Sequence, residues 1–357
     1  MNSPALDRRA LIAGALSLSG VGAARAPAVD AASLVRTLAA LVEREYPDPA
    51  LARRIAASLR VKLKAGRYRG LSPAALATAL TDDLRAVGHD QHLKVAYDPR
   101  SAADRSPADS PPPQPSTPAP REPSARAKAI FGPQNYGITR VEVLPGNIGL
   151  LQIDNFVPLY GVMRERYGAA MGLLADTYGL VLDLRGNGGG TSDTPAHLMS
   201  YFFDREPFVL DRLEWRRIPA EEDRTTRDLA GPNYGEQRPL MVAIGPKTFS
   251  AAEATAYDLQ AFKRAVVVGE TSRGGANPGD FFNLGQGFEA FTPQGRAVNA
   301  VTGGNWEGVG VKPDIAAPAA EAVKAAQQAA IEAALKRTTD EDALELLREG
   351  LAPASGA

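Results

Sequence analysis

The fold of this chain is decided within residues 239–263, which have the sequence PLMVAIGPKTFSAAEATAYDLQAFK. The apolar run from Pro239 to Ile244 stops at a Gly-Pro pair, which is typical of a buried strand followed by a turn. The segment from Ala251 to about Lys263 is rich in alanine and free of glycine and proline, so it predicts a helix. Ser250 therefore stands at a junction between a strand and a helix.

Ser250 has two interpretations at such a junction. Its hydroxyl would lie near the first unpaired N–H groups of the helix, which stabilise negative charge, and the N–H of Ala251 would face a reacting carbonyl. The spacing Ser250-x-x-Glu253 also matches a capping box, in which both side chains only satisfy the helix's own donors. The rest of the chain has to decide between a nucleophile and a cap.

Length and composition limit the class of protein. A chain of 357 residues suggests two folded units plus tails, and its net charge of −1 gives no broad basic surface, so nucleic acid is not an expected partner. The chain has no cysteine, which excludes disulfides, a thiolate nucleophile and thiolate metal ligands. We expect neither a metal nor an organic cofactor.

The first 26 residues predict an export signal. Arg8 and Arg9 precede a mildly apolar stretch, Ala10 to Ala24, and Ala24-Arg25-Ala26 has the small-x-small form of a cleavage site. The adjacent arginines are compatible with the twin-arginine route. The apolar stretch, about 15 residues, is shorter than the roughly 20 that span a membrane, and no later segment is long enough. We therefore expect a soluble periplasmic or secreted protein without stable membrane insertion after signal removal.

Four further segments follow from periodicity and composition. Residues 30–98 predict a small helical domain, in which Asp48-Pro49 and Ser72-Pro73 start the second and third helices. Residues 99–130 are rich in proline and serine and predict a linker. Residues 131–316 predict an α/β core, and residues 317–357 a helical tail.

Within the core, alternating apolar patterns predict the order of elements. We expect a hairpin from Gly137 to Ile153. The remaining expected elements are helices near Val162–Thr177 and Pro195–Phe203, strands at Leu180–Leu184, Pro239–Ile244 and Ala265–Val268, and the helix that follows Ser250.

A glycine-rich run, Asp183-Leu184-Arg185-Gly186-Asn187-Gly188-Gly189-Gly190, follows one of these strands. Consecutive glycines allow backbone N–H groups to converge on an anion, although a flexible turn has the same composition. The run lacks the Lys-Ser/Thr ending and the spacing of phosphate-binding loops. An oxyanion hole and a plain turn both remain open at this point.

Four blocks in order resemble one family. They are Asp183-x-Arg185-x-Asn187-x-Gly189-Gly190, Thr248-x-Ser250-Ala251-x-Glu253, Val268-Gly269-Glu270-Thr271, and Trp306-Glu307-Gly308-x-Gly310-Val311-x-Pro313-Asp314. Together they resemble the carboxyl-terminal-processing (tail-specific) serine peptidases. The N-terminal helices and the hairpin further resemble the branch that includes the interphotoreceptor retinoid-binding protein and the tricorn core protease. The resemblance implies a crotonase-like α/β catalytic core acting on a peptide or protein substrate.

The general base can be chosen between the branches of this family. In one branch a lysine follows the Gly-Glu block, but Gly275 stands at that place here, and no lysine occurs between Lys263 and Lys312. In the other branch a histidine comes from the N-terminal side, and Asp90-Gln91-His92-Leu93 resembles its Asp-x-His-Leu run. We therefore expect His92 to be the base.

The other titratable candidates have weaker claims. His89 suits a solvated loop and His197 a structural position in a helix. Lys247 would need desolvation to act as a base, and its place in a turn gives no sign of that. Asp314 suits a turn or the start of a strand.

The resemblance assigns the remaining roles. Glu307 matches the acid of the tricorn-type tetrad, and Asp90 is a further acceptor that would orient His92. Gln91 stands where that tetrad has a serine. The expected mechanism is attack by Ser250 on a peptide carbonyl, with the N–H groups of Gly189 and Ala251 holding the oxyanion.

A second class of function fits the same residues. The chain would then be a weak or inactive family member that binds an apolar ligand or a peptide in the same cleft. A thioester hydrolase would need a nucleotide site, which the sequence does not contain. Oligomeric state is not predicted.

Overall fold

The computed structural model describes residues 29–99, 122–158 and 161–351. The chain divides into a short unit, Met1–Asp30, and a second unit, Ala31–Ala357, which contains every helix and strand discussed below. The predicted export signal and most of the predicted linker lie outside the described residues. No described helix is long and apolar enough to cross a membrane.

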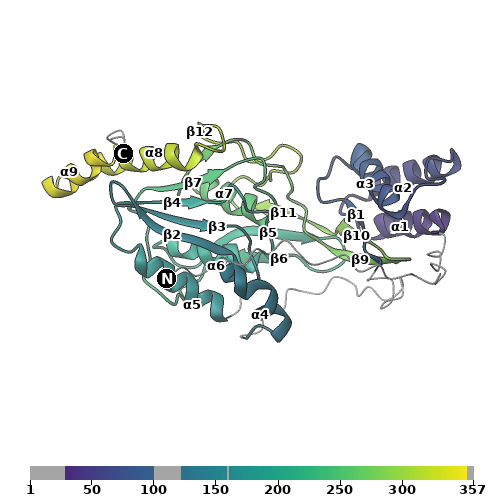
Figure 1. Ribbon diagram of the computed structural model, residues 1–357, viewed down its shortest axis with the longest axis horizontal. Coiled ribbons are helices and arrows are strands. Elements are labelled where there is room, and N and C mark those ends of the chain that lie inside the picture. The colour runs from purple at the N-terminus through teal and green to yellow at the C-terminus, as the bar shows by residue number, and fades with distance from the viewer. Residues whose placement is uncertain (1–28, 100–121, 159–160, 352–357) are drawn as a thin grey trace, which may run out of the picture. The chain divides into compact units, whose positions relative to one another are not determined.

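A six-stranded sheet forms the centre of the second unit, with the strand order β12-β8-β7-β4-β3-β2 (Figure 1). Its strands pair in parallel except for β2, which is antiparallel to β3. The strands are β2 (Ile138–Leu144), β3 (Ile148–Ile153), β4 (Gly179–Asp183), β7 (Leu240–Ile244), β8 (Val266–Gly269) and β12 (Ile315–Ala316). The predicted hairpin and the three predicted core strands are confirmed within one or two residues.

Helices cover both faces of this sheet because β4 and β7 are buried along their whole length and present apolar side chains to each side. One face packs with α5 (Gly161–Leu173), α6 (Asp193–Met199) and α7 (Ala251–Ala261) in one apolar core. The other face packs with α8 (Ala322–Leu335), whose Ala326 and Ala330 contact Val181 and Met241 in a second core. The last helix, α9 (Glu341–Glu349), packs on α8.

Two small antiparallel sheets were not predicted. One has the order β11-β5-β6 and the other the order β1-β10-β9. Their strands are β1 (Lys94–Tyr97), β5 (Val209–Trp215), β6 (Glu221–Arg224), β9 (Gly279–Gly285), β10 (Phe288–Pro293) and β11 (Gly295–Asn299). Because β1 follows His92 directly, its pairing with β10 joins the N-terminal segment to the core.

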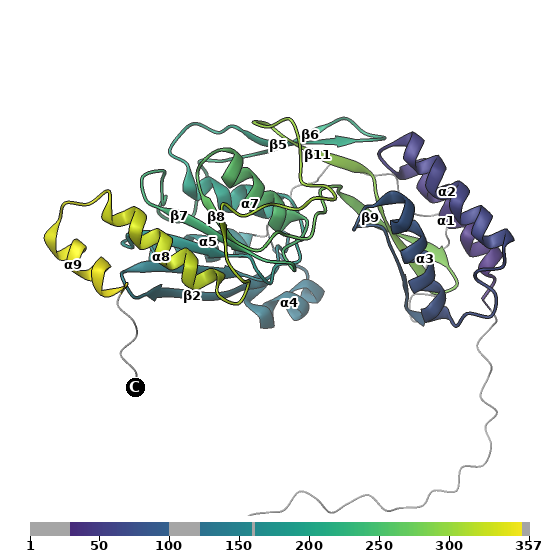
Figure 2. The ribbon, with the colours of Figure 1, turned by 90° about the horizontal axis from the view of Figure 1, so that it is seen from above.

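The N-terminal segment contains the three predicted helices, α1 (Ala31–Glu45), α2 (Pro49–Lys64) and α3 (Pro73–Gly88). Asp48 accepts the N–H groups of Ala50 and Leu51, and Ser72 accepts that of Ala75, so both predicted caps are confirmed. Helix α1 contacts β9 and β10 (Figure 2).

The end of the predicted linker differs from the expectation. Residues Ala125–Phe131 form the helix α4, which is capped by the Ser124 hydroxyl and continues into a 3₁₀ helix, Gly132–Gly137. Alanines and a serine cap outweigh the proline-rich composition that dominates the residues before them. A second 3₁₀ helix, Ser200–Phe202, follows α6.

Candidate active site

Ser250 is the last residue before α7 and has an unusual backbone conformation. Its φ of 55° and ψ of −122° are positive-φ values that residues other than glycine seldom adopt. Such strain persists only where the surroundings enforce it, and it is common at active sites. The strand β7, the turn and helix α7 thus present this serine in a fixed orientation at a helix N-terminus.

Glu253 is one of the groups that enforce this conformation. Its side chain is fully buried, and Oε2 accepts the N–H groups of Ser250 at 2.9 Å and Gly275 at 2.8 Å. Oε1 accepts the Ser272 hydroxyl at 2.5 Å and the N–H of Gly274 at 2.6 Å. Burial raises the pKa of this carboxyl, while the four hydrogen bonds act in the opposite direction. Glu253 therefore caps the helix, as its spacing predicted, and also ties the loop 272–275 to Ser250.

The glycine-rich run lies directly against Ser250. A Cβ atom added to Gly189 would come within 2.8 Å of Ser250 Cβ, so only glycine allows this approach. Asn187 holds the two segments together, because its carbonyl oxygen accepts the Phe249 N–H at 3.0 Å and its side chain donates to the Ile153 carbonyl at 3.0 Å.

The two expected oxyanion donors, the N–H groups of Gly189 and Ala251, have different surroundings. The Gly189 N–H donates to Asn187 Oδ1 at 2.8 Å, so in this structure it is engaged and not free to hold an oxyanion. Ala251 lies at the first position of α7 and lines the main cavity, together with Gly188 and Gly190. Sequence patterns place a glycine run, but they do not show which of its N–H groups the neighbouring asparagine uses.

His92 reaches the same cavity from the other side. Its ring packs against Phe249 at 4.4 Å and Phe291 at 5.5 Å between ring centroids. A Cβ atom on Gly275 would lie 2.7 Å from His92 Cε1 and 2.3 Å from the Phe249 ring. The glycine at the place of the lysine is therefore also the residue that makes room for the histidine.

The His92 imidazole is neutral in this environment. Burial lowers its pKa to about 3, and the positive charges of Arg273 and Arg85 lower it further. A neutral imidazole has one ring nitrogen free to accept a proton.

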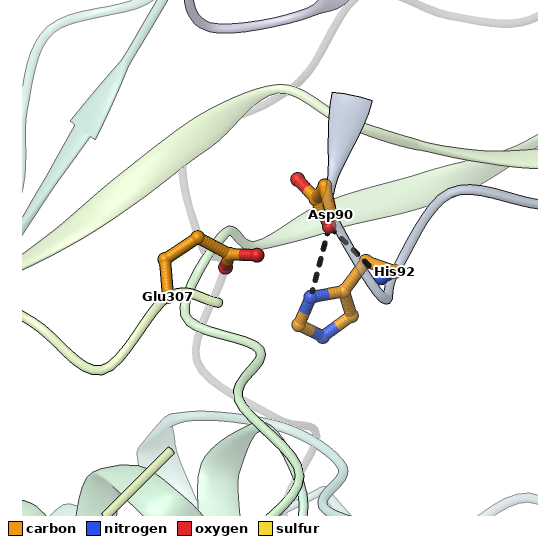
Figure 3. A group of neighbouring side chains, drawn as sticks. All are labelled: Asp90, His92 and Glu307. Atoms are coloured by element: carbon orange, nitrogen blue, oxygen red, sulfur yellow. Dashed lines mark hydrogen bonds and ion pairs between the residues drawn. The ribbon is translucent and has the colours of Figure 1, made fainter. Parts of the chain in front are cut away.

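The carboxyl groups of Asp90 and Glu307 are neighbours of the His92 ring (Figure 3). Asp90 Oδ1 accepts the His92 backbone N–H at 2.8 Å and lies 3.8 Å from His92 Nδ1. Asp90 Oδ2 accepts the Tyr46 hydroxyl and the Asn277 amide. Burial raises the pKa of Asp90, and its hydrogen bonds oppose the increase.

Glu307 completes this cluster. Its Oε2 accepts the Ala276 N–H at 2.6 Å, whereas Oε1 and His92 Nδ1 are buried without a hydrogen-bond partner among the described residues. Burial and then the charge of Asp90 raise the pKa of Glu307 to about 8. One ligand atom from each of Asp90, His92 and Glu307 falls within 4.8 Å of the others. The structure thus brings these three predicted residues together.

This cluster also has the residue types of a metal site, but its atoms are mostly engaged. Zinc sites take three or four protein ligands. Among the buried atoms of these three side chains, only His92 Nδ1 and Glu307 Oε1 lack a hydrogen-bond partner in the described part of the chain, because both Asp90 oxygens already accept hydrogen bonds. The arrangement suits a histidine oriented by carboxyl groups better than a bound cation.

The remaining candidates lie outside the cluster of Asp90, His92 and Glu307. His89 is exposed at the end of α3, and His197 is buried in α6 beside Tyr201. Lys247 is exposed outside the cavity, and Asp314 accepts the Val267 N–H in a structural role. Gln91 lines the cavity, and its carbonyl oxygen accepts a hydrogen bond from Arg85.

Ser250 and His92 share one cavity of about 940 Å³. Its aromatic lining is Trp215, Phe249, Phe281, Phe291 and Trp306. This volume accommodates a chain of several residues rather than a small ion, and it is large for a drug-sized ligand site.

Comparison with known proteins gives matches to two family models and to one curated relative. Residues 147–317 match the model of peptidase family S41, and residues 28–131 match the model of the N-terminal domain of Peptidase S41 in eukaryotic IRBP. A carboxy-terminal-processing protease from Bartonella bacilliformis is 28% identical over 144 residues, which is 38% of this chain and 30% of that protein. The match thus spans under a third of the length of that relative.

Solved structures share the fold at low sequence identity. A peptidase from Parabacteroides merdae described as putative has a TM-score of 0.56 at 15% identity, covering 88% of this chain and 99% of that one. A lipoprotein from Streptococcus agalactiae has a TM-score of 0.53 at 15% identity, covering 84% and 96%. The photosystem II D1 C-terminal processing protease has a TM-score of 0.50 at 15% identity, covering 89% and 100%.

The two matched models place the chain in the class of proteins with S41 peptidase domains. Both matched regions are parts of one family. The chain belongs to peptidase family S41.

Proposed function

We propose that this protein is an exported serine peptidase that hydrolyses peptide bonds through an acyl-enzyme on Ser250, with His92 as the general base. The observation that carries the proposal is the arrangement of the two residues. Ser250, held at positive φ at the N-terminus of α7, lines the same cavity as a buried neutral histidine.

The proposed first step uses the two ring nitrogens of His92 in different roles. Nδ1 lies near Asp90 and Glu307, so Nε2 is the nitrogen left to take the proton of the Ser250 hydroxyl. The Ser250 oxygen then bonds to the substrate carbonyl carbon, and the carbonyl oxygen becomes an oxyanion near the Ala251 N–H. Nearby carboxylates stabilise the imidazolium that forms.

The second half of the reaction reverses this proton path. The imidazolium donates its proton to the leaving amine as the peptide C–N bond breaks, which leaves an ester on Ser250. A water molecule then attacks the ester while His92 accepts its proton, and the acid product leaves. Glu253 and Asn187 act as positioning residues, since they touch the backbone around Ser250 rather than the substrate.

Labelling with a fluorophosphonate probe tests the nucleophile and the base together. We expect wild type to be labelled at Ser250 and Ser250→Ala and His92→Ala to remain unlabelled. His89→Ala is the matched control, because this second histidine is exposed and lies just upstream of His92; it should be labelled like wild type. Full labelling of the His92→Ala variant would remove His92 from the mechanism.

Two finer parts of the proposal have separate support. The crotonase-like assignment of the core rests on the order of its motifs, and a structure of the purified protein would check it. Export rests on the sequence of residues 1–26 alone. We expect the intact mass of protein from the periplasm or medium to lack this segment, and cytoplasmic protein of full mass would contradict export.

A further inference from the structure

We propose that the cavity contains a subsite for a basic side chain of the substrate, an arginine or a lysine, whose cationic group reaches Asp211 and Asp223. This inference rests on the proposed function, because it treats the cavity as a peptide-binding site. It adds the chemical class of a residue that the protein would prefer near the cleaved bond.

The walls of the subsite come from the sheet β11-β5-β6. Successive side chains in a strand point to opposite faces, so Asp211, Leu213 and Trp215 share one face of β5, and all three line the cavity. Ala297 of β11, which pairs with Leu213, lines it as well. These apolar walls suit the methylene groups of a long basic side chain, which lie along apolar surface while the charge lies beyond.

The end of the subsite is acidic. Asp211 pairs across the sheet with Asp223, and both line the cavity. The carboxyl group of Asp258 in α7 donates a hydrogen bond to Asp211 and accepts the Asn299 amide at 2.8 Å, and Asn299 also hydrogen-bonds with Asp211. Two carboxyl groups from β5 and β6 therefore line the cavity, and a third, from α7, contacts Asp211.

One atom in this group points to a missing cation. Asp211 is 3% exposed, and its Oδ1 has no hydrogen-bond partner among the described residues. A buried acceptor without a donor is costly, and a guanidinium or ammonium group arriving through the cavity would supply one. The hydroxyl of Ser192 is already hydrogen-bonded to Asp223 and leaves Asp211 Oδ1 unsatisfied.

The charges around the subsite agree with this assignment. Burial raises the pKa of Asp211 to about 6 and that of Asp223 to about 7, as expected for carboxyl groups without a cation beside them. No ion pair joins either residue to a lysine or arginine in the described part of the chain. The arginines of the cavity, Arg85 and Arg273, act on His92 instead.

The distance from the nucleophile favours a long side chain. Ala251 and Ala254 of α7 line the cavity, and Asp258 follows Ala254 on the same face of the helix. At ~1.5 Å per residue, Asp258 lies about 12 Å along the helix from Ser250. A short side chain next to the cleaved bond would not reach the acidic end.

Cleavage of matched peptides is the first test. Three fluorogenic peptides would differ only at the residue before the cleaved bond, which is arginine, norleucine or aspartate. We expect kcat/KM for the arginine peptide to exceed that for norleucine by about tenfold or more, as one charge-assisted hydrogen bond allows. Two isosteric variants, Asp223→Asn and Asp211→Asn, should each remove most of this preference. The Asp223 side chain is only partly buried, whereas that of Asp211 is buried.

Glu222→Gln is the matched control, because Glu222 lies on the same strand with its exposed side chain on the other face. It should keep the preference of wild type. Equal cleavage of the arginine and norleucine peptides by wild type would overturn the subsite and leave the proposed peptidase intact.

Cation binding is a second test that does not depend on catalysis. Both tryptophans of the chain, Trp215 and Trp306, line the cavity, so their fluorescence reports on its contents. We expect agmatine, and not the neutral pentanol, to change the fluorescence of the Ser250→Ala variant saturably. Adding Asp211→Asn or Asp223→Asn should weaken the affinity for agmatine at least about tenfold. If wild-type protein binds agmatine but neither cleaves peptides nor reacts with the fluorophosphonate probe, the subsite is supported and the proposed peptidase is refuted. No response to agmatine would overturn the subsite.

Discussion

At the scale of single residues, the site depends on residues that position more than one of its parts. Glu253 closes the helix that follows Ser250 and also holds the loop that carries Gly275. Gly275 in turn leaves space for His92 and Phe249. A change at either residue would therefore move the proposed base, His92, as well as the backbone of the proposed nucleophile, Ser250.

Glu307 predicts how activity depends on pH. Its pKa of about 8 means that it is protonated below that pH and anionic above it, and the anion stabilises the imidazolium of His92. We expect kcat/KM of wild type to rise as the pH passes through about 8. The variant Glu307→Gln should have lower activity and should lack this rise in the same assay.

The same residue should affect stability with the opposite sign. A carboxyl group whose folded pKa is raised from 4.5 to about 8 binds more protons in the folded state between these values, so stability should fall as pH rises through that window. The melting temperature of wild type, compared with Glu307→Gln, measures this difference. A Gln variant with the pH profile of wild type in both assays would contradict the role of Glu307.

At the scale of elements, strand β1 sets the position of His92, the proposed base. The backbone of Val95 faces away from β10, because it exchanges hydrogen bonds with the Thr81 hydroxyl. Ala96 therefore faces β10, opposite Glu289. His92, four residues earlier, is positioned by this pairing.

Substitution of Ala96 by proline should disconnect the base from the core. Proline removes an N–H of the ladder, so we expect Ala96→Pro to lose most fluorophosphonate labelling while the circular dichroism of the core remains near that of wild type. Ala96→Ser keeps the N–H and serves as the control. Undiminished labelling of the proline variant would show that the pairing does not hold His92 in place.

The elements also show how far the sequence predicts the structure. The central strands and their helices were predictable because Leu240 to Ile244 and similar runs are continuously apolar. Strands β5 and β6 were missed because Asp211, Arg212 and Glu222 interrupt their alternation with charges. The choice of His92 came from a motif, whereas its distance from Asp90 and Glu307 depends on the pairing of β1 with β10, which no local pattern encodes.

At the scale of the whole unit, contacts far apart in sequence join the N-terminal helices to the core. Glu45 of α1 is 1% exposed, accepts the Gln294 amide at 3.1 Å and pairs with Arg217 at 2.8 Å. Arg216 donates to the Tyr46 carbonyl in the same region. These bonds anchor the helix that precedes the segment carrying His92.

Removal of Glu45 should therefore weaken both stability and the site. Glu45→Ala leaves the buried Gln294 amide without its acceptor, and we expect a loss of about 1–3 kcal/mol in the free energy of unfolding together with slower labelling of Ser250. Glu43→Ala on the same helix breaks an ion pair with Arg60 that is much more exposed and should cost at most about 1 kcal/mol. Denaturant titration of both variants measures the difference, and equal losses would contradict the anchoring role of Glu45.

The pairing of β1 with β10 has a consequence for biosynthesis. The ribosome makes His92 almost 200 residues before the strand that positions it, Phe288–Pro293, and more than 200 residues before the neighbouring carboxyl group of Glu307. Domains fold from the N-terminus as they emerge. A nascent chain that already contains Ser250 and His92 still lacks β10 and Glu307, so the proposed peptidase cannot act until the ribosome has also made residues 288–307.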